Sequence, residues 1–260
     1  MATTSTLQQS RMTLHVRGTW SARDDRKASA VWLGILWVGM IAGFGVDFPG
    51  YLRKNPPAPV LVHVHAAVFT VWMLLLTAQV LLVLRDRVAL HRKLGVFAVG
   101  WACLMAVMGP VAFISIVAQQ AKLHGPFPYP FISVHVADIG GFLVLLACGI
   151  ALRKNPAAHK RMMILSTVAL ADPGFARFSG YFLPEATKVF PWFVEVFYGN
   201  VLLIVLMLGW DWWRGRLIRS HVIGSVSLTA ALYFASLMYF WPPWKALTMQ
   251  WVAVWAKHFG

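Results

Sequence analysis

Long apolar segments separated by short polar ones form the dominant pattern of this chain. A helix that crosses the hydrocarbon core of a bilayer, about 30 Å thick, needs about 20 mainly apolar residues. Seven segments are long enough, and we predict a membrane-spanning helix in each: residues 28–46, 60–84, 94–118, 131–152, 162–182, 192–213 and 222–241. We therefore expect an all-α membrane protein with seven transmembrane helices in residues 28–241, a basic N-terminal segment in residues 1–27 and an interfacial C-terminal segment in residues 242–260.

Composition and charge support this fold class and set an expected orientation. Hydrophobic residues make up 59% of the chain and charged residues 12%, which excludes an ordinary soluble domain. Of the 23 Lys and Arg residues, 16 precede the first predicted span or follow the second, fourth and sixth. Positive residues concentrate in cytoplasmic segments, so we expect the N-terminus in the cytoplasm, the C-terminus outside, and a bacterial inner membrane as the location. This distribution also explains the net charge of +14 without nucleic acid.

Five histidines lie about one turn from the starts of predicted spans two to five. His63 and His65 are in span two, His91 begins span three, His135 is in span four and His159 begins span five. Because successive spans run in opposite directions, His63 or His65 shares the outer level with His135, while His91 shares the inner level with His159. Near a helix N-terminus the dipole opposes a protonated imidazole, and metal binding requires the neutral form. His63 and His65 are about 200° apart around a helix, so only one of them can face the shared site. The remaining histidines lie in tails or loops, and we expect them to be solvated: His15, His124, His221 and His258.

This arrangement resembles the two-haem transmembrane b-type cytochromes of the ascorbate-reducible class. In that family, four consecutive helices each donate one histidine, and alternate helices share a haem. The segments HRKLG at 91–95 and HKRMM at 159–163 are also similar to segments of poorly characterised bacterial multi-pass membrane families. The resemblance implies an electron-transfer protein that binds haem b. It implies ligation of the outer haem by His63 or His65 with His135, and of the inner haem by His91 with His159.

Charged residues beside these histidines are candidates for further contacts with the cofactor. Arg92, Lys93, Lys160 and Arg161 flank the inner pair, where they could meet haem propionates or lipid phosphates. Asp138 lies one turn beyond His135 and could orient its ring by accepting a hydrogen bond. The expected redox partner is a quinol or another reductant, and an enzyme of this kind would be a membrane oxidoreductase.

Three other hypotheses remain open at this point. The first is a metal-dependent membrane enzyme using zinc, iron or copper near the outer face. Its polar pocket would be lined by His63 or His65, His135, Asp138, Asp172 and Glu195. Alternatively, Asp172 and Arg177 could simply neutralise each other. The second hypothesis is a cofactor-free structural or assembly subunit. The third is a channel or transporter, with helices broken at Pro110, at Gly140-Gly141 and at Asp172-Pro173-Gly174.

Overall fold

The computed structural model describes residues 22–53, 55, 58–124, 131–187 and 191–259, and every element within these ranges is a helix. The helices are α2 (Ala22–Leu52), α3 (Val60–Leu84), α4 (Val88–His124), α5 (Ile132–Ala151), α6 (Pro156–Val168), α7 (Asp172–Phe182), α8 (Pro184–Thr187), α9 (Trp192–Trp213), α10 (Arg219–Phe240) and α11 (Pro242–Phe259). Six of these described helices are long and apolar enough to cross a membrane, namely α2, α3, α4, α5, α9 and α10.

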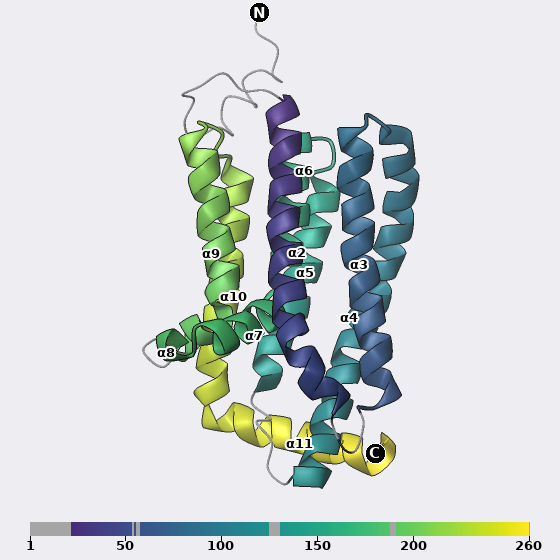
Figure 1. Ribbon diagram of the computed structural model, residues 1–260, viewed down its shortest axis with the longest axis vertical. Helices are drawn as coiled ribbons and strands as arrows, with labels where there is room; N and C mark the ends of the chain where they lie inside the picture. The colour runs from purple at the N-terminus through teal and green to yellow at the C-terminus, as the bar shows by residue number, and fades with distance from the viewer. Residues whose placement is uncertain (1–21, 54, 56–57, 125–130, 188–190, 260) are drawn as a thin grey trace, which may run out of the picture.

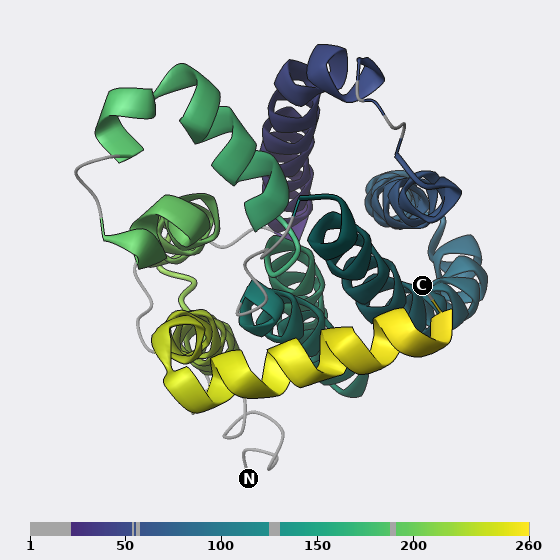
Figure 2. The same ribbon diagram turned by 90° about the horizontal axis from the view of Figure 1, so that it is seen from below.

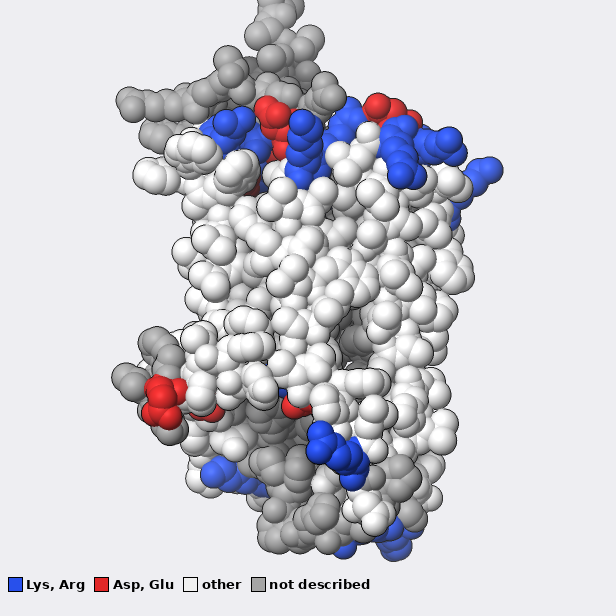
Figure 3. Space-filling model, viewed as in Figure 1, with Lys and Arg blue, Asp and Glu red and all other residues white. Residues whose placement is uncertain are grey.

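The long helices run side by side, and the two ends of the bundle differ (Figure 1). At one end α2, α4, α6 and α10 begin, and Lys and Arg side chains gather there above an uncharged middle band, with fewer charged side chains toward the other end (Figure 3). We call this the basic end. At the opposite end α11 lies across the bundle, as Figure 2 shows from below, and we call it the α11 end.

Local sequence signals account for the turns at the basic end. Asn155 caps α6, because its side-chain oxygen accepts a hydrogen bond from the Ala158 N–H at 3.2 Å, and Pro156 occupies the first turn. Gly215 follows α9 with a φ of 63°, the left-handed conformation that commonly ends a helix. Asp86 ends α3 in the same way with a φ of 57°. These residues end one helix or start the next, so the chain reverses its direction at the basic end.

The fifth predicted span, residues 162–182, is not one continuous helix. The chain forms α6, breaks after Val168 and resumes as α7, which runs across the bundle instead of along it (Figure 1). Pro173 lies in the first turn of α7. A proline disfavours helical geometry in the residue before it, so the Asp172-Pro173 step permits a new helix to start but not the old one to continue. The prediction of a single spanning helix is therefore wrong for this segment.

Glycines allow α7 to pack closely against its neighbours. A Cβ atom on Gly43 of α2 would lie 1.8 Å from the backbone oxygen of Gly174. One on Gly199 of α9 would lie 2.3 Å from the side chain of Phe175. The backbone of α7 can approach α2 and α9 this closely only because those positions carry no side chain. This contact holds the break in place within the bundle.

The predicted C-terminal segment, residues 242–260, contains the helix α11. Its Thr248 and Val252 side chains are buried. Val252 packs in a small cluster with Val117 and Ala118 of α4. The helix therefore closes one end of the bundle with one face, while the side chains of Leu247, Trp251 and Val254 are exposed.

Candidate functional site

Near the basic end, the rings of His91 and His159 face each other. Their centroids are 6.2 Å apart and their planes are nearly perpendicular, at 89°. His91 comes from the first turn of α4 and His159 from the first turn of α6, so the two side chains reach a common level from alternate helices. The pairing expected from the sequence thus corresponds to a ring-to-ring contact in the fold.

The hydrogen bonds of this pair leave ligating nitrogens available. Nδ1 of His159 lies 2.8 Å from the backbone oxygen of Gly149. A carbonyl oxygen can only accept, so Nδ1 carries the proton, and in the neutral ring the lone pair is on Nε2. Such a bond to a carbonyl is the usual support of a metal-ligating histidine. Nδ1 of His91 is buried and has no hydrogen-bond partner.

A second pair lies closer to the α11 end, on α3 and α5. His135 and His65 are near enough to interact electrostatically. Nδ1 of His135 donates to the backbone oxygen of Phe131 at 3.3 Å, which again leaves Nε2 as the acceptor nitrogen. The His135 ring stacks on Phe113 and the His65 ring lies against Phe69, with centroids 3.4 and 4.3 Å apart. Nδ1 of His65 is buried without a partner.

The structure also separates the two histidines at the start of α3. His63 is exposed, and both of its ring nitrogens lie within hydrogen-bond distance of the Tyr51 hydroxyl, at 3.2 and 3.3 Å. His65 faces the interior and interacts with His135. Of the two alternatives left open by the sequence, His65 is therefore the candidate ligand, and His63 belongs to the surface.

These residues suit a planar macrocycle that needs one ligand on each side. Each pair contains one imidazole fixed by a backbone carbonyl and one with a buried, unpartnered Nδ1. A site with three or more protein ligands is not formed: among the described residues, no group of at least three His, Cys, Asp or Glu could hold a metal ion. Figure 3 shows the surface hollowed between α2 and α3 in the half of the bundle nearer the α11 end. The His91–His159 pair is the one with a ring-to-ring contact, and His65 and His135 interact only electrostatically.

Lys160 and Arg161 have partners other than a propionate. Arg161 donates to Asp211 from Nε at 2.5 Å and from Nη2 at 2.8 Å, and Nη2 also lies 3.1 Å from Asp25. Lys160 forms an ion pair with Asp25. The side chain of Arg161 is only 7% exposed. We therefore correct the sequence-based assignment: Arg161 and Lys160 belong to a buried ionic network.

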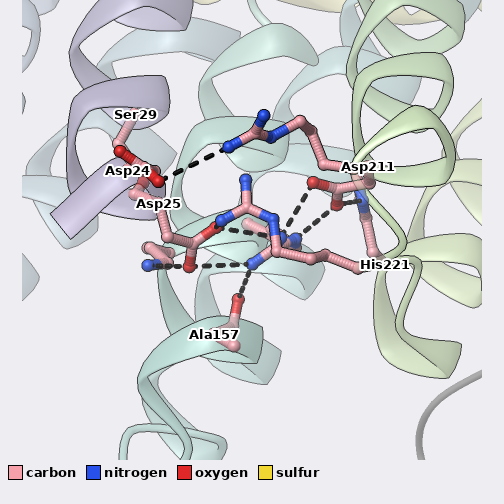
Figure 4. A network of polar contacts seen from close by, with 10 residues as sticks. Asp24, Asp25, Ser29, Ala157, Asp211 and His221 are labelled. Atoms are coloured by element: carbon pink, nitrogen blue, oxygen red, sulfur yellow. Dashed lines mark hydrogen bonds and ion pairs between the residues drawn. The ribbon is translucent and has the colours of Figure 1, made fainter. Parts of the chain in front are cut away.

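This network joins four helices at the basic end (Figure 4). Asp25 of α2 lies 3.0 Å from Nη1 of Arg216, in addition to its contacts with α6. Asp211 of α9 also accepts a hydrogen bond of 2.8 Å from Nδ1 of His221 on α10. His221 is 1% exposed, so the expectation that it is solvated is wrong. Three cations and two carboxylates thus share one buried cluster. We call it the ionic cluster, comprising Asp25, Lys160, Arg161, Asp211, Arg216 and His221.

Burial and pairing act against each other on the two cations of α6. Burial lowers the pKa of the Lys160 ammonium, and the Asp25 carboxylate opposes that shift. Burial also acts to lower the pKa of Arg161, but hydrogen bonds and charge attraction from Asp211 and Asp25 outweigh it, so the pKa is raised. Arg161 therefore stays charged, and its two carboxylates are the reason.

The other residues that the sequence analysis placed beside a cofactor or in the outer pocket do not form those contacts. Arg92 and Lys93 are exposed at the basic end. Asp138 is buried, but it does not orient His135, whose Nδ1 donates to Phe131, and its own Oδ1 has no hydrogen-bond partner. Glu195 is exposed on α9, outside the pocket expected from the sequence.

Arg177 does not pair with Asp172 as the sequence suggested. Its Nε lies 2.6 Å from Asp47 of α2, and its Nη1 donates to the Pro173 carbonyl at 2.7 Å. Asp47 is the better placed partner because Arg177 is on the exposed side of α7, whereas Asp172 is 3% exposed. The hypothesis of mutual neutralisation is therefore wrong.

Comparisons with known proteins add no family to this description. No family model, no curated protein and no solved structure matches the chain.

Proposed function

We propose that this chain is an integral membrane protein of b-cytochrome type that carries electrons between two bis-histidine haem sites. The observation that carries the proposal is the contact between His91 and His159, whose rings lie 6.2 Å apart on alternate helices. A second candidate pair is His65 and His135 on α3 and α5, which interact electrostatically. A haem b held at each pair would supply reversible one-electron storage.

The contribution of the protein is to fix the tautomers of two of the four imidazoles. The carbonyls of Gly149 and Phe131 fix the protons of His159 and His135 on Nδ1. Phe113 and Phe69 pack on the rings of the second pair and exclude water from them. Such packing and hydrogen bonding are the means by which a protein adjusts a haem potential.

We infer that the basic end faces the cytoplasm, in a bacterial inner membrane. The support is the concentration of Lys and Arg at that end (Figure 3). Together α6 and α7 lead the chain from the basic end toward the α11 end, and in this proposal they form the seventh crossing beside the six spanning helices. The N-terminus is then cytoplasmic and the C-terminus outside. The electron donor in this proposal is a quinol or another reductant.

Absorption spectroscopy of the purified protein tests the proposal. We expect a Soret band, a spectral change on dithionite reduction, and about two haems per chain. His159→Ala and His135→Ala should each remove about half of the haem. His63→Ala is the matched control, because His63 lies two positions from His65 but contacts Tyr51 instead, and it should keep both haems.

Two results would refute this function. One is a protein without a Soret band and without iron. The other is equal loss of haem in His63→Ala and His65→Ala, since only His65 faces His135. A single bound zinc, copper or iron ion without haem would instead favour the metal-dependent enzyme.

A further inference from the structure

The break between α6 and α7 brings two carboxyl groups together inside the bundle. Asp172 is the first residue of α7, and Asp138 lies within α5. They are 3% and 6% exposed, and they interact electrostatically with each other. Two carboxyl groups in one buried place cannot both be charged at low cost unless a positive charge compensates them.

No ion pair among the described residues supplies that charge. Among the residues that the structure describes, no Lys or Arg forms an ion pair with Asp138 or Asp172. Arg177 acts on Asp172 only from a distance, and its guanidinium is used by Asp47 and by the Pro173 carbonyl. The carboxyl pair therefore differs from every other buried carboxylate of the described chain.

Three buried side-chain oxygens on α5, α7 and α9 have no hydrogen-bond partner. Oδ1 of Asp138, Oδ1 of Asp172 and Oδ1 of Asn200 are buried and accept no hydrogen bond. Asn200 is 0% exposed, and its Nδ2 donates to the backbone oxygen of Val168 at 2.8 Å. That bond fixes the amide at the last residue of α6, so its oxygen is held at the break.

The helix ends at the break carry opposite partial charges, because Val168 ends α6 and Asp172 begins α7. The C-terminus of α6 at Val168 carries a partial negative charge from its backbone carbonyls. Discontinuous membrane helices in transporters coordinate Na⁺ at such carbonyl ends. Carboxylate, amide and carbonyl oxygens are hard ligands that suit alkali and alkaline-earth ions better than zinc or copper. Because Mg²⁺ loses its water reluctantly, a dry site of this kind suits Na⁺ better.

We propose that Asp138, Asp172 and Asn200 bind one Na⁺ ion at the break between α6 and α7. The ion compensates the carboxyl pair and uses the three oxygens that lack partners. The three residues lie on α5, α7 and α9, so the bound Na⁺ ion also holds α7 in its position across the bundle. This site does not depend on haem, and it can exist whether or not the histidine pairs bind a cofactor.

Binding of ²²Na⁺ to the purified full-length protein tests the site. We expect about one competable Na⁺ per chain in the wild type, and an apparent affinity at least about tenfold weaker in Asp138→Asn and in Asp172→Asn. Asp86→Asn is the matched control, because Asp86 lies at the basic end with a side chain that is 79% exposed, and it should bind Na⁺ normally.

Thermal unfolding of the wild type gives a second measurement that needs no variant. NaCl should raise Tm by a few degrees over choline chloride at the same ionic strength, because a ligand of the folded state stabilises it. Equal Tm values in the two salts would overturn the proposal, as would equal ²²Na⁺ binding in Asp138→Asn and wild type. A Tm that responds to pH but not to Na⁺ would show that protons alone compensate the pair, and would overturn it too. Each of these outcomes is independent of the haem spectrum.

Discussion

Buried charge occurs in two regions of this molecule, and the two are built differently. In the ionic cluster at the basic end, Asp211 faces Arg161 at 2.5 Å and Asp25 lies 3.0 Å from Arg216. At the break between α6 and α7, the buried Asp138 and Asp172 interact electrostatically with each other instead. The first region brings its own cations from α6 and from the α9–α10 turn. In the second, the described residues supply carboxyl groups, the Asn200 amide and the ends of α6 and α7, and no ion pair with either carboxyl group.

The difference indicates which region serves structure and which serves binding. A buried ion pair costs much to break by removing one partner, and the ion pairs of the ionic cluster join α2, α6, α9 and α10 at one level. An uncompensated buried pair adds nothing to stability on its own. A bound cation would compensate such a pair, so the ionic cluster holds the helices together and the break is the proposed ion site.

Removal of the central cation from the ionic cluster should have the largest effect. Arg161→Met would leave Asp25 and Asp211 buried without their main partner, at a cost of about 3–5 kcal/mol in the free energy of unfolding. Denaturant unfolding in detergent measures it. Arg26→Met removes a more exposed cation, paired with Asp86, and should cost less than about 1 kcal/mol. Similar losses in the two variants would show that the ionic cluster does not fasten the helices.

A carboxylate removed from each region should change stability in different ways. Asp211→Asn should lower the free energy of unfolding by about 1.5–3 kcal/mol, because Asp211 accepts charge-assisted bonds from Arg161 and His221. Asp138→Asn should not lower it in Na⁺-free buffer, since no cation is lost. Unfolding of both variants with and without Na⁺ gives the comparison. A loss in Asp138→Asn equal to that in Asp211→Asn, measured without Na⁺, would contradict it.

The geometry of the break can be changed from α2. Gly43→Ala places a Cβ atom 1.8 Å from the Gly174 oxygen, so α7 must shift, at a cost of about 1–3 kcal/mol in unfolding free energy. We also expect weaker Na⁺ binding, because α7 carries Asp172. Gly45→Ala is the matched control on the same helix, since a Cβ there meets nothing within 4 Å. Normal Na⁺ affinity in Gly43→Ala would show that α2 does not set the position of α7.

The sequence was a good guide to the helices because bilayer thickness sets their length. Predicted spans 60–84 and 192–213 have the same bounds as α3 and α9. The fifth segment was predicted less well. Asp172-Pro173-Gly174 was noticed as an interruption, but the direction of α7 depends on close contacts with Gly43 and Gly199. Those contacts join residues far apart in sequence, and no local pattern indicates them.

The candidate sites show the same division between local and long-range information. The levels of the histidines follow from helix direction alone, so His91 and His159 could be paired in advance. The choice between His65 and His63 needed the Tyr51 contact, which is a matter of packing. The partners of Arg161 were missed, because Asp25 lies 136 residues away in a segment taken as a basic tail.

The smallest expected effect concerns the cap at the start of α6. It compares the contribution of this local hydrogen bond with that of the long-range ion pairs that hold the same helix. The Asn155 side chain accepts the Ala158 N–H at 3.2 Å, and Asn155→Ala should cost about 1 kcal/mol in the free energy of unfolding. Asn155→Asp retains a capping oxygen and should cost less. Because the ionic cluster still holds Lys160 and Arg161, we expect both variants to keep the Na⁺ affinity of the wild type. A loss from Asn155→Ala as large as that from Arg161→Met would mean that the position of α6 depends on its own first turn and not on the ionic cluster. The ionic cluster would then not be the region that stabilises the helix packing.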